Sequence, residues 1–265
     1  MFRAEDHTFV ICAYQESPYL EDCIRSLLGQ RTKTALLMST STPNSHIRGL
    51  TEKYGIPLRI NEGEKGIAGD WNFALFQAKT PLVTLAHQDD LYEPVYTEIM
   101  LRKMNRAKNP ILFAGNYAEL RGAERVTSSR LLNIKKVLQI PMRLFPGQVW
   151  ARRASLAFGN SVCCPSVTYV RSVMEQHPFA AGLKSNLDWQ KWEELSRLKG
   201  SFCCSRQVVM CHRIHEESET SRVIREESRS AEDYEMFRKF WPEGIAKKLT
   251  GLYAGSEKSN EIRTD

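Results

Sequence analysis

Short apolar runs alternate with segments of helical spacing along the first hundred residues. The apolar, β-branched run at 8–12 predicts a strand, and Ser17 with Pro18 predicts the N-cap and first turn of a helix that ends near Gly29. The alternation continues with expected strands at 35–38, 58–60 and 81–86 and expected helices at 45–55, capped by Ser45, and 70–78, capped by Asp70. Four strands separated by helices imply right-handed crossovers and a mainly parallel central sheet flanked by helices, so the expected fold class is α/β.

The later part of the chain is less regular. Further strands are expected at 111–114, 167–170 and 208–210, a helix is expected at 188–198, and the basic stretch 121–142 has a helical pattern with weak caps. There is no internal repeat and no low-complexity linker. We therefore expect one compact domain with a C-terminal helical extension from about residue 221, whose apolar residues either form an interface or, as we favour, pack on the domain.

Composition excludes several classes of protein. The 265 residues are 42% hydrophobic and 26% charged, which is ordinary for a globular domain. No stretch approaches 18 uninterrupted apolar residues and the first residues are charged, so we expect neither a spanning helix nor a secretory signal. Seven cysteines, including two adjacent pairs but no CxxC, favour buried thiols and a reducing compartment.

Positive charge is concentrated in the middle of the chain. The formal net charge is +6, but between residues 101 and 155 there are twelve Lys or Arg against two acids, Glu119 and Glu124. This favours an anionic partner, either a phosphate-bearing substrate, a membrane surface or nucleic acid, although a solvated surface would have the same pattern. Aromatic residues suited to base stacking are sparse here, so a nucleic-acid-binding module is the weaker alternative and no nucleic-acid partner is expected.

The expected strand ends bring polar residues to one crevice, because ligands of such sheets bind beyond the carboxyl ends of the strands. These residues are Tyr14 and Glu16 after the first strand, Ser39 and Thr40 at the second, and His87, Gln88, Asp89 and Asp90 at the fourth. Adjacent carboxylates at the end of a buried strand suit Mg²⁺ or Mn²⁺, or are simply solvated acids of a turn. The absence of GxxxxGK[ST], and of GxGxxG after the first strand, disfavours P-loop kinases and Rossmann dehydrogenases.

Two later segments carry further candidate chemistry. Asp188 begins an expected helix, either as a general base or as an acid that complements the helix dipole, and Trp189 beside it offers an apolar platform of the kind that binds sugar rings. His215 is a candidate ligand for a metal held elsewhere, whereas His212 is expected to be structural. The spacing of these histidines and the nearby cysteines fits no standard zinc site.

Five segments, in order along the chain, resemble glycosyltransferase family 2. They are the strand and helix from Val10 to Gln30, the segment Asn61 to Asn72, His87 to Asp90, Leu187 to Trp189, and Arg213 to His215 with Ser218 and Thr220. Each motif is weak alone, but five in sequence with suitable spacing are specific. The resemblance extends from about Phe9 to Thr220.

This resemblance implies a GT-A (Rossmann-like) fold and metal-dependent, inverting transfer of a sugar from a nucleotide-diphosphate sugar to an acceptor hydroxyl. The family pattern implies that Asp89 and His215 hold Mg²⁺ or Mn²⁺, that Asp188 is the catalytic base, and that Trp189 contacts the acceptor. Donor-binding positions would be Tyr14, Glu16, Ser39, Thr40, Gly66, Asp70, Asn72, His87, Gln88 and Asp90. Three departures leave the nucleotide open: the second strand ends without an Asp, His87 replaces the first Asp of the metal motif, and Trp71 stands where Arg is common.

The resemblance also suggests an organisation and a cellular role. Residues 1–220 would form the GT-A domain, with the donor half at about 1–100 and the acceptor and catalytic half at about 101–220, and 221–265 the helical extension. The role that the resemblance suggests is bacterial capsule or exopolysaccharide assembly. In that role the acceptor would be a saccharide or a lipid-linked saccharide, and the protein would be cytoplasmic, with peripheral contact at the inner face of an anionic membrane. The alternative enzyme, a sugar-phosphate nucleotidyltransferase, would need a Gly-rich, Arg-bearing loop after the first strand, and residues 13–17 contain neither Gly nor Arg.

Overall fold

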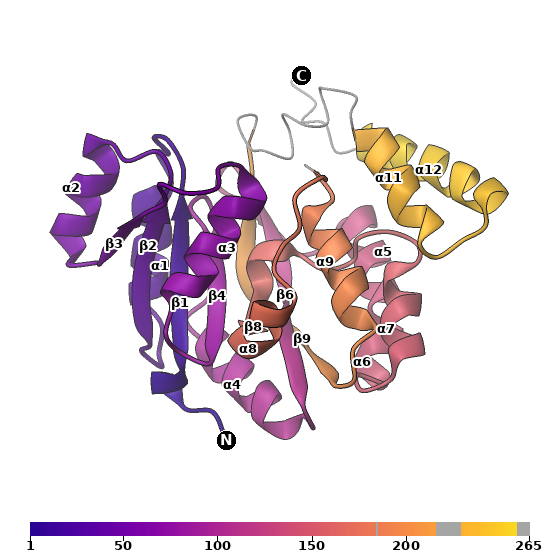
Figure 1. Cartoon of the computed structure of the whole chain (residues 1–265), viewed down its shortest axis with the longest axis horizontal. Coiled ribbons are helices and arrows are strands. Elements are labelled where there is room, and N and C mark those ends of the chain that lie inside the picture. The colour runs from indigo at the N-terminus through magenta and orange to yellow at the C-terminus, as the bar shows by residue number, and fades with distance from the viewer. Residues whose placement is uncertain (184, 216–228, 259–265) are drawn as a thin grey trace.

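The structure is a computed structural model that describes residues 1–183, 185–215 and 229–258. Within these residues a single sheet of nine strands runs through the molecule in the order β3-β2-β1-β4-β8-β6-β9-β5, with β7 paired to β6 (Figure 1). The strands are β1 (His7–Ala13), β2 (Ala35–Thr40), β3 (Leu58–Ile60), β4 (Leu82–His87), β5 (Leu91–Tyr92), β6 (Pro110–Arg121), β7 (Glu124–Val126), β8 (Val167–Val170) and β9 (Ser201–Ile214).

The two halves of the sheet differ in strand direction. β1 runs parallel to β2 and β4, and β2 runs parallel to β3, which confirms the parallel arrangement expected for the first hundred residues. In the second half, β8 is antiparallel to both β4 and β6, whereas β6 and β9 are parallel. The fold is therefore α/β, as expected, with a mixed rather than parallel second half.

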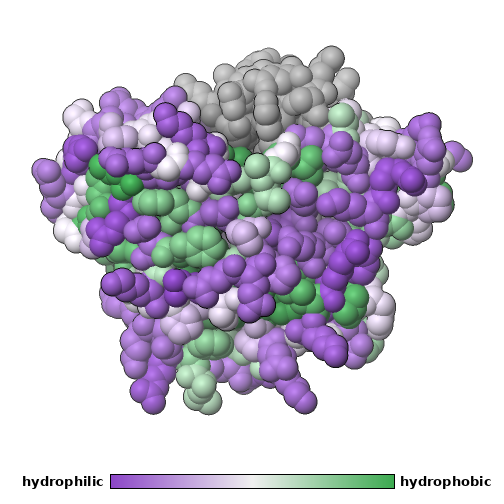
Figure 2. All heavy atoms as spheres, in the orientation of Figure 1, coloured by the Kyte–Doolittle hydropathy of each residue, from purple (hydrophilic) through white to green (hydrophobic). Residues whose placement is uncertain are grey.

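Helices flank the sheet on both faces, with α3 packed on β1, β2 and β4, and α4 packed on β6 and β9 (Figure 1). The helices are α1 (Leu20–Leu28), α2 (Ser45–Tyr54), α3 (Ile67–Gln77), α4 (Tyr96–Arg106), α5 (Arg130–Leu138), α6 (Ile140–Leu144), α7 (Val149–Leu156), α8 (Arg171–Gln176), α9 (Leu187–Ser196), α11 (Arg229–Arg238) and α12 (Glu243–Lys258), with short 3-10 turns η1 (Ala4–Asp6) and η2 (Cys164–Ser166). In the space-filling view the surface is a mixture of hydrophilic residues and smaller hydrophobic patches (Figure 2).

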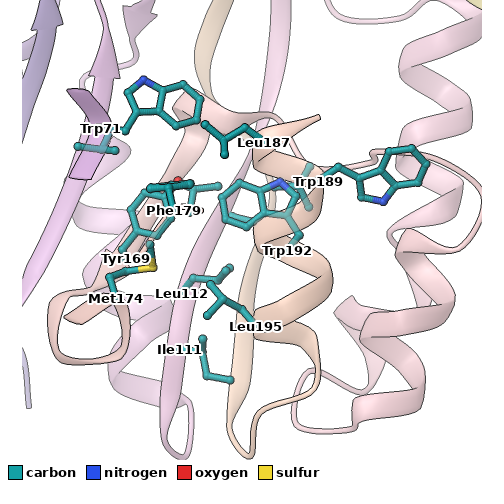
Figure 3. Packing of buried hydrophobic residues seen from close by; sticks show 14 of the residues in the cluster. Trp71, Ile111, Leu112, Tyr169, Met174, Phe179, Leu187, Trp189, Trp192 and Leu195 are labelled. Atoms are coloured by element: carbon teal, nitrogen blue, oxygen red, sulfur yellow. The ribbon is translucent and has the colours of Figure 1, made fainter. Parts of the chain in front are cut away.

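Alternation along the strands builds two cores, one on each face of the sheet. On β1, Val10 packs with the helices of one face, while Phe9 and Ile11 pack with those of the other. The first core is rich in aromatic rings, and within it Tyr169 stacks on Trp192 at 5.8 Å between ring centroids (Figure 3). These cores fix the strand ends whose loops form the site described below.

Three helices start at other residues than the sequence analysis expected. Ser17 donates its hydroxyl to Asp89, and α1 begins at Leu20. The cap of α2 is Asn44, which accepts a hydrogen bond from the Ile47 amide at 2.9 Å. α3 begins after Gly66, so Asp70 lies in its first turn rather than at its cap.

The stretch 121–142 was expected to be helical throughout, which is wrong for its first part. β6 continues to Arg121 and turns back into β7 at Gly122, whose φ of 58° lies in the left-handed region that favours glycine. α5 begins only after Ser129, whose side chain accepts a hydrogen bond from the Leu132 amide at 3.2 Å. The glycine turn ends the helical pattern that the apolar spacing alone suggested.

The C-terminal helices pack on the domain, as the sequence analysis favoured. Met236, Phe237 and Ala246 are fully buried in the first core, and the Trp241 indole donates to the Ala157 carbonyl at 2.7 Å. All seven cysteines are free thiols, each buried or half-buried. Among the described helices none has the length and apolarity needed to cross a bilayer.

Candidate active site

The loops that follow β1, β2 and β4 are joined by hydrogen bonds at one edge of the sheet. The Gln88 side chain accepts from the Tyr14 amide at 2.9 Å and donates to the Tyr14 carbonyl at 3.0 Å. The Gln15 amide donates to the Thr42 hydroxyl at 2.6 Å, and Asn44 donates back to the Gln15 carbonyl at 3.0 Å. The ends of these three strands thus meet at one edge of the sheet, as the sequence predicts.

The two adjacent carboxylates after β4 have different environments. Asp89 is half-buried at the rim, where it accepts a hydrogen bond from the Ser17 hydroxyl at 2.5 Å and lies 3.3 Å from Nε2 of His215. Asp90 is only 1% exposed, and its Oδ1 lies 3.0 Å from Nδ1 of His212 and accepts from the Arg213 amide at 2.9 Å. Asp89 therefore lies at the rim of the sheet beside His215, and Asp90 anchors the end of β9.

Arg213 ties β9 to the rim and to α1. Its Nε donates to the Asp89 carbonyl at 2.9 Å, and its guanidinium lies 4.2 Å from the centre of the Tyr19 ring and 3.7 Å from Asp22. Tyr19 also contacts the His215 ring edge-on, at 5.0 Å between centroids. These contacts hold His215 beside Asp89.

Burial and charge act in opposite directions on the two histidines nearest the acids. Burial lowers the pKa of His212, but the charge of Asp90 and the hydrogen bond to it outweigh burial, so the net pKa of His212 is raised. Burial dominates at His87 and lowers its pKa, although Asp90 opposes the shift. His87 lies against Trp71, and its Nε2 has no hydrogen-bond partner among the residues that the structure describes.

The Asp89–His215 pair has a geometry suited to a divalent cation. Two ligand atoms at right angles around an ion, each about 2.1 Å from it, lie about 3 Å apart, which is close to the 3.3 Å between Asp89 Oδ2 and His215 Nε2. Across the described ranges no cluster of three or more His, Cys, Asp or Glu side chains is arranged to hold a metal ion. A site with two protein ligands fits Mg²⁺ or Mn²⁺, since such ions complete their coordination with water and phosphate oxygens.

Asp188 lies in the first turn of α9, half-buried. Asn160 donates to its Oδ2 at 2.7 Å, and the Trp189 amide donates to its Oδ1 at 2.7 Å. Burial raises the pKa of the Cys163 thiol, and the charges of both Asp90 and Asp188 contribute to that shift. The charges of Asp90 and Asp188 thus act on the same buried thiol.

The turn before Asp188 is held by α11. One carboxylate oxygen of Glu232 accepts from the Ser185 amide at 2.8 Å, the Ser185 hydroxyl at 2.5 Å and the Asn186 amide at 3.0 Å. The neighbouring Asp233 accepts from the Asn186 side chain at 2.7 Å. The C-terminal helices thus fix the position of the candidate base.

The remaining donor-side predictions lie around the β1 and β2 ends. Tyr14 and Glu16 are exposed, whereas Ser39 and Thr40 are each 3% exposed. Asp70 accepts from the Ser41 hydroxyl at 2.9 Å and from Asn61 at 2.7 Å. Gly66, just before α3, has a φ of 94°. These predicted roles in donor binding stay predictions.

Four predicted ligand-binding residues have their side chains engaged inside the protein. The Gln88 amide is taken up by Tyr14, as described above, and Asn72 exchanges two hydrogen bonds of 2.8 Å with the Phe179 backbone. Asp90 is buried beneath the rim. Trp189 is fully buried, and its indole donates to the Leu156 carbonyl at 3.1 Å. Its ring lies on the side of α9 opposite to the ring of Trp192 (Figure 3). The prediction that Trp189 forms an acceptor platform is therefore wrong, whereas the donor-binding roles of Gln88, Asn72 and Asp90 stay predictions.

Several residues of the site were missed by sequence reasoning. Ser17 was taken as a helix cap, and Arg213 only as part of a motif. Asn160 and Glu232 had no local signal. Asn160 binds Asp188, 28 residues away in the chain, and Glu232 binds Asn186 and Ser185, 46 and 47 residues away. Only the folded structure brings such partners together.

Comparisons with known proteins identify the family and the fold of this chain. The sequence profile described as "Glycosyl transferase family 2" matches residues 8–155. The comparison with curated proteins found no match. Among solved structures, S. aureus TarS (residues 1–349) with UDP-GlcNAc has a TM-score of 0.63 at 14% identity, over 96% of this chain and 73% of that one. The mannosyltransferase PcManGT from Pyrobaculum calidifontis, with GDP-Man and Mn²⁺, has a TM-score of 0.65 at 13% identity, over 97% and 76%. Glucosyl-3-phosphoglycerate synthase from Mycobacterium tuberculosis has a TM-score of 0.54 at 13% identity, over 80% and 73%.

Proposed function

Since the chain belongs to glycosyl transferase family 2 and is a glycosyltransferase, we propose that it moves a sugar from a nucleotide-diphosphate sugar to an acceptor hydroxyl, with inversion and with a divalent cation. Similar folds that hold UDP-GlcNAc, or GDP-Man with Mn²⁺, support a donor and a metal of these kinds. The basic middle of the chain supports an anionic acceptor, such as a lipid-linked diphosphate saccharide in bacterial surface polysaccharide synthesis.

Asp89 and His215 are the residues that would hold Mg²⁺ or Mn²⁺ in this proposal. When bound, the cation compensates the negative charge that develops on the leaving diphosphate. Ser17 orients Asp89 through its hydrogen bond of 2.5 Å, and Arg213 holds the backbone of the same residue. The protein thereby fixes one carboxylate oxygen and one imidazole nitrogen before the donor arrives.

Asp188 would remove the proton from the acceptor hydroxyl. The acceptor oxygen forms a bond to the anomeric carbon on the face opposite the diphosphate, the bond from that carbon to the phosphate oxygen breaks with its electron pair, and the acceptor proton passes to the Asp188 carboxylate. Asn160 holds one oxygen of Asp188 in place. The Trp189 amide holds the other, so both oxygens of this half-buried carboxylate are oriented by hydrogen bonds.

The observation that carries this proposal is the pairing of Asp89 with His215 at the end of β4, where Asp89 Oδ2 lies 3.3 Å from His215 Nε2. Removing a positioned base costs about 10² to 10⁴ in rate, so Asp188→Asn should lower kcat by that factor. Both oxygens of Asp188 accept a hydrogen bond, so asparagine replaces one acceptor by a donor, and a melting curve establishes that the variant is folded at the assay temperature.

The assay measures sugar transfer from whichever nucleotide-diphosphate sugar the protein binds. Glu52→Gln, on the exposed face of α2, is the matched control. The control should retain full turnover. An Asp188→Asn enzyme with near-normal kcat would show that another group accepts the proton.

A further inference from the structure

Large apolar side chains are exposed together on one side of the molecule. Six of them come from a short stretch of α5, α6 and α7, and their exposed fractions run from 44% to 62%. We call them the α5–α7 surface: Ile134, Val137, Ile140, Leu144, Phe145 and Trp150. Figure 2 shows hydrophobic side chains at the lower right, over the region where Figure 1 places α6 and α7.

The surface is an apolar stripe separate from the core. α5 and α6 form a nearly continuous helix, since the Gln139 amide donates to Lys135 O and the Arg143 amide to Gln139 O, both at 3.1 Å. At about 100° per residue, Ile134, Val137, Ile140 and Leu144 fall within an arc of about 120°. Leu132 and Met142, which are buried, lie on the opposite side. This helical stretch therefore has two apolar faces, of which only one is covered.

Phe145 and Trp150 extend the stripe. Their rings lie 5.3 Å apart, and they are 48% and 58% exposed. Contiguous exposed apolar side chains mark sites of interaction, whereas singly scattered ones do not. Aromatic rings of this kind are typical of the boundary between lipid headgroups and acyl chains.

The charge around the stripe has one sign. No Asp or Glu occurs between Glu124 and Glu175 in the sequence. Arg130 is exposed at the start of α5, and Lys136 and Arg143 lie along one edge of the stripe, half-buried. An apolar stripe beside cations, on a segment of sequence that contains no acid, is complementary to an anionic surface with an apolar interior.

We propose that the α5–α7 surface docks on a bilayer that contains anionic lipids. The apolar and aromatic side chains would enter the headgroup boundary, and Arg130, Lys136 and Arg143 would contact the acidic headgroups. A second copy of this chain is a poorer occupant, because a two-fold contact would place the same cations against one another. This inference concerns a surface and is independent of the transfer chemistry.

Vesicle cosedimentation tests the proposal with the whole chain and no sugar donor. Binding should be strong to phosphatidylcholine vesicles that contain phosphatidylglycerol, weak to phosphatidylcholine alone, and reduced as salt is added. Equal binding to both vesicle types, or to neither, would overturn the proposal.

Apolar variants separate this surface from general stickiness. Leu144→Ser with Trp150→Ser should lower the partition coefficient for anionic vesicles at least about tenfold, since both side chains would lose their burial in lipid. Leu252→Ser is the matched control, because Leu252 is 73% exposed on α12 and lies outside the surface. It should bind as the unmodified protein does.

Charge variants test the second half of the proposal. Arg130→Gln with Lys136→Gln should lower the partition coefficient about tenfold or more at low salt and reduce its dependence on salt. Arg48→Gln is the matched control, since Arg48 is exposed on α2, at the opposite end of the molecule in Figure 1.

Melting curves establish that each variant is folded before it is compared. Sedimentation of the free protein distinguishes the remaining occupant. Lipid docking would be refuted if the protein bound no vesicle and formed a dimer that the Leu144→Ser with Trp150→Ser variant could not form. That result would assign the surface to a second copy of the chain.

Discussion

His7 predicts how the stability of this protein depends on pH. The side chain lies at the start of β1 with no exposed surface, between the Thr34 hydroxyl at 3.1 Å and the Thr84 hydroxyl at 2.8 Å. Burial lowers its pKa from 6.5 to about 3. The ring therefore stays neutral in the folded protein at pH values where it is protonated in the unfolded chain.

The sign and size of the effect follow from this difference. Because the unfolded chain binds the proton more tightly, the contribution of His7 to stability is complete above pH 6.5 and is lost as the pH falls from 6.5 toward 3. Each pH unit well below 6.5 costs about 1.4 kcal/mol, so the free energy of unfolding should fall by about 2 kcal/mol between neutral pH and pH 5 from this residue alone.

Urea unfolding of the unmodified protein and of His7→Gln at several pH values measures this contribution. Glutamine retains one polar partner and does not titrate, so the variant should lose about 2 kcal/mol less on acidification, whatever its stability at neutral pH. His46→Gln, on α2, controls for the loss of a histidine that is only half-buried and whose Nε2 lies 3.1 Å from the Ser17 carbonyl. Parallel pH profiles for His7→Gln and the unmodified protein would refute the claim that a buried neutral ring drives the effect.

Two further predictions concern the candidate site. Glu232→Ala should lower kcat about tenfold by releasing the turn before Asp188, since small displacements of a catalytic group are costly. Glu232→Gln keeps an acceptor oxygen and should retain most of the rate. Glu235→Ala, on the exposed side of α11, is the control and should retain the full rate. If Glu232→Gln is as impaired as Glu232→Ala, the hydrogen bonds do not carry the effect. In thermal-shift measurements with Mn²⁺, the matching nucleotide diphosphate at one hundred times its Kd should add about 2.7 kcal/mol of stability, and chelation or Asp89→Asn should remove the part that depends on the metal. An unchanged shift in Asp89→Asn would exclude Asp89 as a ligand.

The sequence predicts much of the donor half because its signals there are local. Each strand from β1 to β4 is a short apolar run next to a helix, and connections through helices make these strands parallel, so their carboxyl ends meet at one edge of the sheet. The helix that begins at Leu187 was expected within one residue of its actual start. Asp89 and Asp188 were therefore placed at the correct ends of their elements before any contact was known.

Long-range contacts explain what the sequence does not predict. Trp189 and Trp192 look equivalent in a helical pattern, yet one packs toward Phe237 of the C-terminal helices and the other stacks on Tyr169 of the sheet. The hydrogen bond between Asn72 and Phe179 joins residues 107 positions apart. Neither partner carries a pattern that identifies the other.

The different roles of Asp89 and Asp90 show how the site depends on the second half of the sheet. β9 ends beside the acids that follow β4, and the buried Asp90 accepts a hydrogen bond of 2.9 Å from the Arg213 amide of that strand. Two residues further along, His215 comes to lie 3.3 Å from Asp89. A burial cost that would be prohibitive for a lone carboxylate is offset by the hydrogen bonds that fix the register of the strand end. Because the Asp90 carboxylate holds the strand that supplies His215, the Asp89 carboxylate does not have to bind the backbone of β9 and remains beside the imidazole at the rim.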